Sequence, residues 1–217
     1  MNVLITGTTR GIGRACAELF LEKDFNVFGF DILPASINNE KYHHYFVDVS
    51  RKETFPEIPN MDIVINNAGT QNKNDIEVNL MGTVNITERY GIHEGIKSIV
   101  NNASASAHTG AEFPLYSASK GGVLAYTKNV ALRIAQYGAC CNSVSFGGVL
   151  TELNEPVIKD RKAWKEIMDV TPLKKWMNVE EAAEWIYFIA VKNTFMTAQD
   201  VLIDGGESSN MKFVWRD

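Results

Sequence analysis

The stretch Thr6–Gly13, which reads TGTTRGIG, constrains the fold of this chain more than any other. Residues 2–5 before it are short and apolar, which predicts a buried strand. Residues 14–23 after it carry apolar side chains at helical spacing and no helix breaker. The glycines therefore lie at a turn from a strand to a helix, and this context makes a weak glycine pattern informative.

Each glycine of this turn has a physical role if the turn binds a pyrophosphate. Gly7 permits the tight turn, Gly11 leaves room for the anion, and Gly13 lets the helix pack close to the strand. The free N–H groups and the positive dipole end of the helix then face the anion. The spacing is G-x-x-x-G-x-G rather than the commoner G-x-G-x-x-G, and the alternative is a glycine-rich turn that binds no ligand.

Composition restricts the remaining possibilities. The 217 residues predict one domain, 1–217, with a sizeable core. A net charge of −5 without a basic run argues against nucleic acid as a partner. No apolar run approaches the roughly 20 residues that span a membrane. The cysteines and histidines have no metal-ligand spacing, so we expect no metal site. The odd number of cysteines and the lack of a secretory leader predict a cytoplasmic protein.

Strand and helix patterns alternate along the chain. Strands joined by helices, with nearly continuous apolar strands, predict a parallel sheet covered on both faces. Right-handed crossovers then give a doubly wound α/β Rossmann fold with a seven-stranded parallel sheet. We expect strands at 2–5, 26–31, 45–48, 62–66, 98–101, 141–145 and 201–204, and helices near 12–23, 72–90, 117–136, 160–168 and 179–191.

An acidic residue ends the second predicted strand. Asp31 lies 18 residues beyond Gly13, where a dinucleotide-binding fold places a carboxylate that accepts hydrogen bonds from the adenosine ribose. A carboxylate there repels a 2′-phosphate, which favours NAD over NADP. Arg10 is the contrary signal, since a cation beside the turn attracts that phosphate. We give Asp31 more weight, because a 2′-phosphate would lie almost on top of it.

A second group of residues can transfer a proton. Tyr116 and Lys120 are four residues apart and share one face of a predicted helix. An ammonium beside a phenol stabilises the phenolate and lowers its pKa from about 10, which suits a general acid or base. Ser104 follows the fifth predicted strand and can donate a hydrogen bond to a carbonyl oxygen, and Asn79 is a polar residue inside a helix.

These motifs follow the order that is typical of one family. The sequence resembles a short-chain dehydrogenase/reductase (SDR) over nearly its whole length. The resemblance rests on TGxxxGIG at 6–13, Asp31, Asp48-Val49, Asn66-Asn67-Ala68-Gly69, Asn79, Ser104, Tyr116-x-x-x-Lys120, Asn142-Ser143-Val144-Ser145 and Asp204-Gly205-Gly206. Each motif is weak alone, and together they are highly specific.

The resemblance implies an NAD-dependent oxidoreductase that transfers a hydride between nicotinamide and a secondary alcohol or ketone. Tyr116 would exchange a proton with the substrate oxygen, Lys120 would favour its ionisation and hold the nicotinamide ribose, and Ser104 would orient that oxygen. Asn79 would anchor a water in a proton relay to Lys120.

The resemblance also implies a cofactor-binding set. Asp48 and Val49 would flank the adenine, and Thr151 would meet the nicotinamide carboxamide. The full set is Gly7, Thr9, Arg10, Gly11, Ile12, Gly13, Asp31, Asp48, Val49, Asn67, Ala68, Gly69, Tyr116, Lys120, Gly147, Val149 and Thr151.

Two departures from the family pattern affect the predicted site. Phe146 replaces the usual proline before Gly147, so the loop beside the nicotinamide can have a different shape. Ser104 is one residue closer to Tyr116 than is usual in the family, and Ser106 competes with it for the role of catalytic serine. We prefer Ser104, because the alignment of the fifth strand with the family's strand puts the serine there.

Three segments, 50–61, 70–78 and 152–177, are short for the family. The last one usually covers the substrate, so we expect a shallower or more open pocket. Two other functions remain as alternatives. One is an NADPH-dependent 3-oxoacyl thioester reductase, which Arg10 favours, and the other is a non-catalytic NAD-binding regulator that senses redox state.

Helix 117–136 is apolar over more of its circumference than one contact with a sheet requires. The resemblance implies that it pairs with helix 72–90 across a twofold axis, in a homodimer or a homotetramer. The alternative is a monomer in which the apolar tail 207–217 covers this second face.

Overall fold

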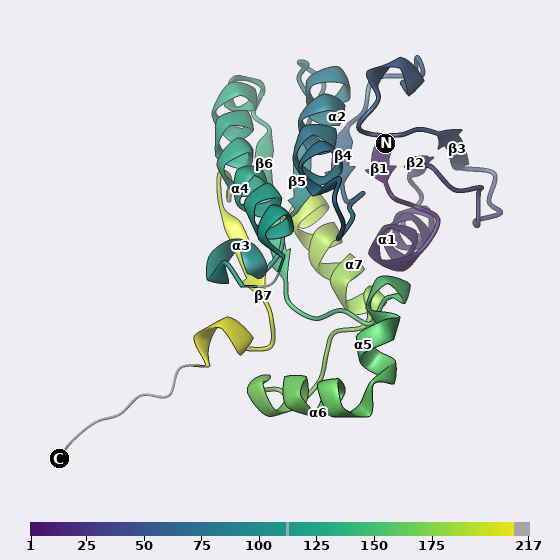
Figure 1. Ribbon diagram of the computed structural model, residues 1–217. Coiled ribbons are helices and arrows are strands. Elements are labelled where there is room, and N and C mark those ends of the chain that lie inside the picture. The colour runs from purple at the N-terminus through teal and green to yellow at the C-terminus, as the bar shows by residue number, and fades with distance from the viewer. Residues whose placement is uncertain (112, 211–217) are drawn as a thin grey trace.

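In the computed structural model, which describes residues 1–111 and 113–210, seven parallel strands form one sheet (Figure 1). The strand order is β3-β2-β1-β4-β5-β6-β7, so the chain winds outward in both directions from the β1–β4 pair. This order confirms the predicted doubly wound α/β fold. The strands are β1 (Asn2–Thr6), β2 (Asn26–Asp31), β3 (Tyr42–Phe46), β4 (Ile63–Asn66), β5 (Ser98–Asn102), β6 (Cys140–Phe146) and β7 (Asp200–Ile203).

Alternate residues of the strands supply two separate cores. Val3 and Ile5 of β1 pack toward helices α1 (Gly11–Glu22) and α7 (Val179–Tyr187). Leu4 packs on the other face, toward α2 (Gly82–Tyr90) and α4 (Pro114–Ile134). Figure 1 shows the two helix layers with the sheet between them. Because helices cover both faces, the central strands can be apolar throughout.

Two helices contain π-helical turns. One turn, η2 (Ile76–Met81), precedes α2, and the other, η5 (Phe188–Lys192), follows α7. The predicted helix 72–90 therefore begins at residue 76, and its first part has the wider π geometry. Such bulges occur often at functional sites, and η2 contains Asn79.

Strand β3 begins three residues earlier than the sequence predicted, at 42 rather than 45. It is an edge strand with β2 as its one neighbour in the sheet order. An edge position tolerates polar side chains such as those of His43 and His44. An apolar pattern therefore does not mark its start.

Segment 152–177, which we expect to be short for the family, contains two small helices, α5 (Glu155–Lys159) and α6 (Arg161–Val170). Asp160 caps α6 by accepting the N–H groups of Lys162 and Ala163. Neither helix contains a buried residue, and both lie at the foot of Figure 1, beyond the end of the sheet. The remaining short helices are α3 (Ser106–Thr109), η1 (Lys52–Thr54), η3 (Ala135–Tyr137), η4 (Glu152–Asn154) and η6 (Glu207–Ser209).

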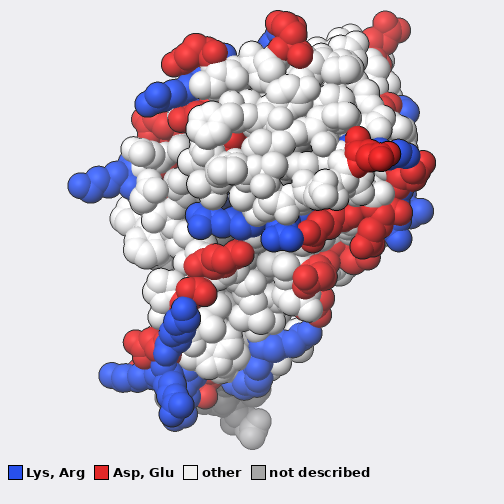
Figure 2. Space-filling model, turned by 90° about the vertical axis from the view of Figure 1, so that its right-hand side faces the viewer, with Lys and Arg blue, Asp and Glu red and all other residues white. Residues whose placement is uncertain are grey.

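The sequence predicts two features of the outside of the molecule: an apolar tail that could cover a helix face, and no run long enough to span a membrane. The apolar residues 211–217 of the tail lie outside the described residues. Among the helices that are described, none has both the length and the apolar character that a bilayer crossing requires. On the face drawn in Figure 2, Lys and Arg side chains are interspersed with Asp and Glu.

Candidate functional site

The glycine-rich turn has the geometry that its sequence predicts. Gly7 and Gly11 have positive φ angles of 75° and 56°, which favour glycine. A Cβ on Gly13 would lie 2.0 Å from the carbonyl oxygen of Gly7, so only glycine allows α1 to pack this close to the turn. Arg10 precedes the helix without a side-chain cap, in contrast to the capped helices α6 and α7. The first N–H groups of α1 have no side-chain acceptor there, as an anion site requires.

A cleft of about 780 Å³ opens at the carboxyl ends of the strands, beside this turn. That volume is typical of a small-molecule or cofactor site. Most of the predicted site residues line it: Gly7, Arg10, Gly11, Ile12, Asp31, Asp48, Val49, Asn67, Ala68, Gly69, Ser104, Tyr116, Lys120, Gly147, Val149 and Thr151. Thr9, Gly13 and Asn79 are not among the lining residues in the described part of the chain. The fold thus brings segments that are distant in the sequence to one edge of the sheet.

Asp31 links the loop that follows β2 to the glycine-rich turn by hydrogen bonds. Its carboxylate accepts the N–H of Thr9 at 2.9 Å and the N–H of Leu33 at 2.9 Å. The Ser36 hydroxyl donates to the Thr9 carbonyl oxygen at 2.7 Å. Arg10 is exposed. Thr9 is therefore a residue that holds the shape of this end of the cleft.

Asn67 connects the turn after β4 to the neighbouring strands β1 and β5 by hydrogen bonds. Its Nδ2 donates to the carbonyl oxygen of Thr6 at 3.0 Å, and its Oδ1 accepts from Asn102 Nδ2 at 3.0 Å. The N–H groups of Asn67 and Ala68 both donate to Thr6 Oγ1, at 3.0 and 2.9 Å. These bonds fix the backbone of β1, β4 and β5 around the floor of the cleft.

Asp48 uses its carboxylate within its own loop. Its Oδ1 accepts the N–H of Ser50 at 2.9 Å and the Ser50 hydroxyl at 2.6 Å. Val49 is buried and packs against the place where Gly82 lacks a Cβ. Both residues therefore have structural partners in addition to their position at the cleft.

Tyr116 and Lys120 leave the same face of α4 toward the cleft. The Nζ atom of Lys120 lies 5.7 Å from the centroid of the Tyr116 ring and donates to the carbonyl oxygen of Asn102 at 2.7 Å. Lys120 is 4% exposed. Burial lowers its pKa from 10.5 to about 8, and the negative charge of Asp75 acts in the opposite direction. A buried ammonium beside a phenol is a suitable arrangement for proton transfer.

The two candidate serines occupy different positions. Ser104 lines the cleft, whereas Ser106 is buried at the start of α3 and is not among the lining residues described. The Ser106 hydroxyl donates to Ser104 Oγ at 3.0 Å, and the Ser106 N–H donates to it at 3.2 Å. Ser106 therefore holds the hydroxyl of Ser104, which leaves Ser104 as the serine that a bound ligand can reach.

Asn79 lies behind the cleft, 1% exposed, and both atoms of its amide group are hydrogen-bonded. Its Oδ1 accepts the N–H of Thr70 at 2.7 Å, and its Nδ2 donates to the Thr70 carbonyl oxygen at 3.0 Å and to Ser119 Oγ at 3.1 Å. The Asn79 side chain thus holds the turn at residues 69–70 against α4. Because Asn79 is not among the described lining residues of the cleft, its side chain is not placed to contact a ligand directly.

Three further residues shape this site, and sequence reasoning missed two of them, Asn102 and Asp75. Asn102 supplies the acceptor for Lys120, and Trp176 packs so closely on Gly148 that a Cβ there would lie 2.0 Å from its ring. Asp75 is a buried carboxylate one helical turn before Asn79. No local pattern in the sequence distinguishes Asp75 from a solvated carboxylate.

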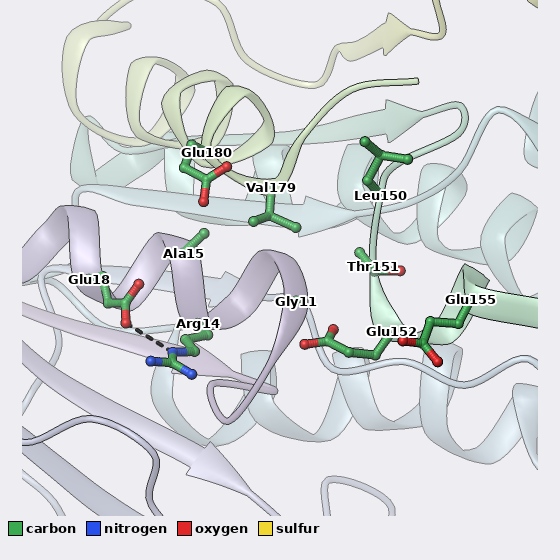
Figure 3. A pocket seen from close by; sticks show the side chains of 10 residues that line it. All are labelled: Gly11, Arg14, Ala15, Glu18, Leu150, Thr151, Glu152, Glu155, Val179 and Glu180. Carbon is green, nitrogen blue, oxygen red and sulfur yellow. Dashed lines mark hydrogen bonds and ion pairs between the residues drawn. The ribbon is translucent and has the colours of Figure 1, made fainter. Parts of the chain in front are cut away.

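A smaller hollow of about 430 Å³ adjoins this cleft (Figure 3). Gly11, Thr151 and Glu152 belong to the walls of both spaces. Four glutamates line the hollow, and its one arginine, Arg14, is paired with Glu18 at 2.9 Å. Because the hollow is acidic, it is a poor site for a pyrophosphate, which leaves the larger cleft as the candidate cofactor site. The described residues contain no group of His, Cys, Asp and Glu that could hold a metal ion.

Comparison with known proteins agrees with this geometry. A family profile described as enoyl-(acyl carrier protein) reductase matches residues 7–208. The chain belongs to the short-chain dehydrogenase/reductase family. This SDR protein is therefore an enzyme of an oxidoreductase family.

Two curated relatives illustrate the range of this family. The SDR protein is 29% identical to the NAD-dependent glycerol dehydrogenase of Listeria innocua, over 94% of this chain and 92% of the relative. It is 29% identical to a 3-oxoacyl-[acyl-carrier-protein] reductase of Thermotoga maritima, over 94% of this chain and 96% of the relative.

Two solved structures share the whole fold. One is a 4-hydroxyisoleucine dehydrogenase mutant complexed with NADH and succinate, with a TM-score of 0.85 and 27% identity over 96% of this chain and 99% of that one. The other is ElxO with NADP bound, with a TM-score of 0.82 and 27% identity over 96% of this chain and 98% of that one.

Proposed function

We propose that this SDR protein is an NAD-dependent oxidoreductase that transfers a hydride between nicotinamide and a secondary alcohol or ketone. The observation that carries the proposal is the joint position of Ser104, Tyr116 and Lys120 on one cleft, next to an uncapped helix N-terminus. A small-molecule substrate would enter from the open side of this cleft.

The residues of the cleft fit a dinucleotide. Gly11 leaves space where a side chain would block a pyrophosphate, and the N–H groups at the start of α1 can donate to its oxygens. Asp31 retains acceptor capacity for ribose hydroxyls beyond the two N–H groups it already binds. The nicotinamide, when bound, supplies or accepts the hydride.

The side chains of the protein would transfer the proton to and from the substrate oxygen. Ser104, held by Ser106, donates a hydrogen bond to the substrate oxygen and orients it. Tyr116 gives its hydroxyl proton to that oxygen during ketone reduction and takes it back during alcohol oxidation. Lys120 favours the ionised form of Tyr116 and holds the nicotinamide ribose. Asn79 would fix the turn beside Lys120, and its Oδ1, which accepts one hydrogen bond, retains capacity to anchor a relay water.

The preference for NAD over NADP belongs to the same proposal. Asp31 would face a 2′-phosphate with a carboxylate, and the exposed Arg10 is the nearby cation that offsets it. One related structure is complexed with NADH and another has NADP bound, so the preference of this chain is tested by direct measurement.

A second candidate function is reduction of a 3-oxoacyl thioester with NADPH. It is favoured by the Thermotoga maritima relative and by Arg10. A third, non-catalytic sensing of NAD, is disfavoured by the retention of both Tyr116 and Lys120 at the cleft.

One screen distinguishes these functions. The purified protein is assayed with NAD⁺ and NADP⁺ against polyols, sugars, sterols and β-hydroxyacyl thioesters, and binding of both reduced cofactors is measured by fluorescence. Turnover of an alcohol with NAD⁺ supports the first function, and turnover restricted to acyl thioesters with NADP⁺ supports the second. Cofactor binding without turnover of any substrate supports the third.

We also infer that the enzyme assembles as a homodimer or homotetramer in the cytoplasm. Apolar side chains are exposed along α4 and η2, with Leu132 78%, Leu115 49% and Met81 43% exposed. The three cysteines are free thiols, as a reducing compartment favours. Light scattering tests the assembly: a mass near 24.2 kDa would reject it, and Leu132→Glu should reduce the mass of an oligomer built on α4.

A further inference from the structure

Asp75 is a buried carboxylate beside the candidate proton-transfer residues, and the steps described above give it no role. It lies just before η2, one helical turn from Asn79, and is 1% exposed. A carboxylate that is removed from water needs partners, because burial of an unpaired charge is costly. The surroundings of Asp75 therefore indicate what it does.

The hydrogen bonds of Asp75 connect it to the turn that borders Lys120. Its Oδ1 accepts the N–H of Asn72 at 2.7 Å and the hydroxyl of Thr70 at 2.9 Å. The backbone of Thr70 in turn binds both ends of the Asn79 amide. A Cβ on Gly69 would lie 3.2 Å from Asn79 Oδ1 and 3.7 Å from Lys120 Nζ. Hydrogen bonds thus connect Asp75 to the turn at residues 69–72, and the Gly69 backbone of this turn lies beside the ammonium.

The charge of Asp75 also acts on Lys120. Burial lowers the pKa of Lys120 to about 8, and Asp75 is the group whose negative charge raises it. The other ionisable group at the ammonium is Tyr116, whose ring centroid lies 5.7 Å from Nζ. Lys73 and Glu77 lie on the same segment as Asp75 and are exposed, so water screens their charges.

We propose that Asp75 is a positioning residue for the proton transfer, because the turn at residues 69–72 holds its buried carboxylate where the negative charge acts on Lys120. The inference rests on the proposed function of Tyr116 and Lys120. Removal of the negative charge makes proton loss easier for every group near it. The pH range in which the pair holds its proton therefore moves to lower pH without Asp75.

The test separates the charge of Asp75 from its hydrogen bonds. Asp75→Asn keeps an oxygen that can accept from Asn72 and Thr70 and removes the charge. Thr70→Val keeps the charge and removes one hydrogen bond. The titration of Lys120 is followed by NMR of isotopically labelled lysine side chains, with the resonance assigned by its loss in Lys120→Arg. This readout requires no turnover.

In Asp75→Asn we expect the pKa of Lys120 to fall by at least about half a unit, whereas Thr70→Val leaves it within about 0.2 unit of the wild type. The alkaline limb of ketone reduction should move to lower pH by the same amount. If Asp75→Asn does not fold, Asp75→Ser replaces it. An unchanged pKa in the charge-free variant, or an equal fall in Thr70→Val, overturns the proposal. A fall in the pKa in a protein that turns over no substrate supports the effect of Asp75 on Lys120 and overturns the proposed function instead.

Discussion

The Nζ atom of Lys120 lies 5.7 Å from the centre of the Tyr116 ring, one helical turn away on α4. The ammonium is nearly inaccessible to water and donates to the Asn102 carbonyl oxygen at the end of β5. The buried position of Lys120 lowers the stability of the fold and strengthens the effect of its charge on Tyr116. Burial disfavours the charged form of the lysine, and the same charge in a dry site acts strongly on the phenol beside it.

The cost of burying Lys120 should be measurable as stability. Its pKa falls from 10.5 in the unfolded chain to about 8 in the folded one. Between these values the unfolded chain binds more protons, so stability rises with pH through this window and is reduced below it. We expect Lys120→Met to raise the free energy of unfolding at pH 7 by roughly 2 kcal/mol, after the loss of one hydrogen bond is included.

Denaturant unfolding at pH 7 and near pH 10 measures this effect, and the gain should shrink at the higher pH. Lys128→Met on the exposed side of the same helix is the matched control and should gain little at either pH. A Lys120→Met protein that is less stable than the wild type at pH 7 would contradict the account.

Asp31 should determine the choice of cofactor. Asp31→Asn removes the carboxylate charge that a 2′-phosphate would face, so the affinity for NADPH should rise by roughly tenfold relative to NADH. Arg10→Ala should act in the opposite direction, because it removes the exposed cation beside the same position. Fluorescence titration with both reduced cofactors measures the ratio of dissociation constants. The assignment fails if the wild type binds NADPH as tightly as NADH.

Glu152 should oppose cofactor binding. Its Oε2 lies 3.6 Å from the place of a Cβ on Gly11, close to the helix N-terminus that would hold the pyrophosphate. Glu152→Gln removes this negative charge, and we expect the dissociation constant for NADH to fall by about two- to tenfold at low salt. Glu155→Gln, which alters the smaller hollow alone, should leave the constant unchanged. Equal effects of the two variants would exclude a local role for Glu152.

The close contact of α1 with β1 should make Gly13 irreplaceable. A Cβ there would lie 2.0 Å from Gly7 O and 2.4 Å from Asn67 Nδ2, so Gly13→Ala should cost roughly 2 kcal/mol or more, or prevent folding. Gly121→Ala is the matched control, because a Cβ at that position in α4 meets nothing within 4 Å. It should increase stability by up to about 1 kcal/mol, since alanine favours a helix more than glycine does. Thermal unfolding of both variants checks the contrast.

The sequence was sufficient for the central part of the fold. The apolar runs of β1, β4 and β5 are buried on both faces, so each strand had a strong local pattern, and all seven predicted strands are present. The predictions were less accurate where tertiary contacts decide the structure. β3 is an edge strand with two histidines, and its start at Tyr42 had no apolar signal.

The same division applies to the site. Glycines and the spacing of Tyr116 and Lys120 are local patterns, and the cleft contains them. Asp75 is different, because a carboxylate after a polar run reads as solvated unless the fold is known. The orientation of Asn79 is set by hydrogen bonds to Thr70 and to Ser119 of α4. These contacts depend on the tertiary structure, so the sequence pattern could not predict them.

The most direct test of the account is the turnover of Tyr116→Phe. This variant keeps the ring against Lys120 and removes the hydroxyl that would exchange the proton. With the best alcohol from the substrate screen and NAD⁺, we expect kcat to fall by roughly 10²-fold or more, while the dissociation constant for NADH stays within about twofold of the wild type. Near-normal turnover in Tyr116→Phe would contradict the assignment of Tyr116 as the general acid and base.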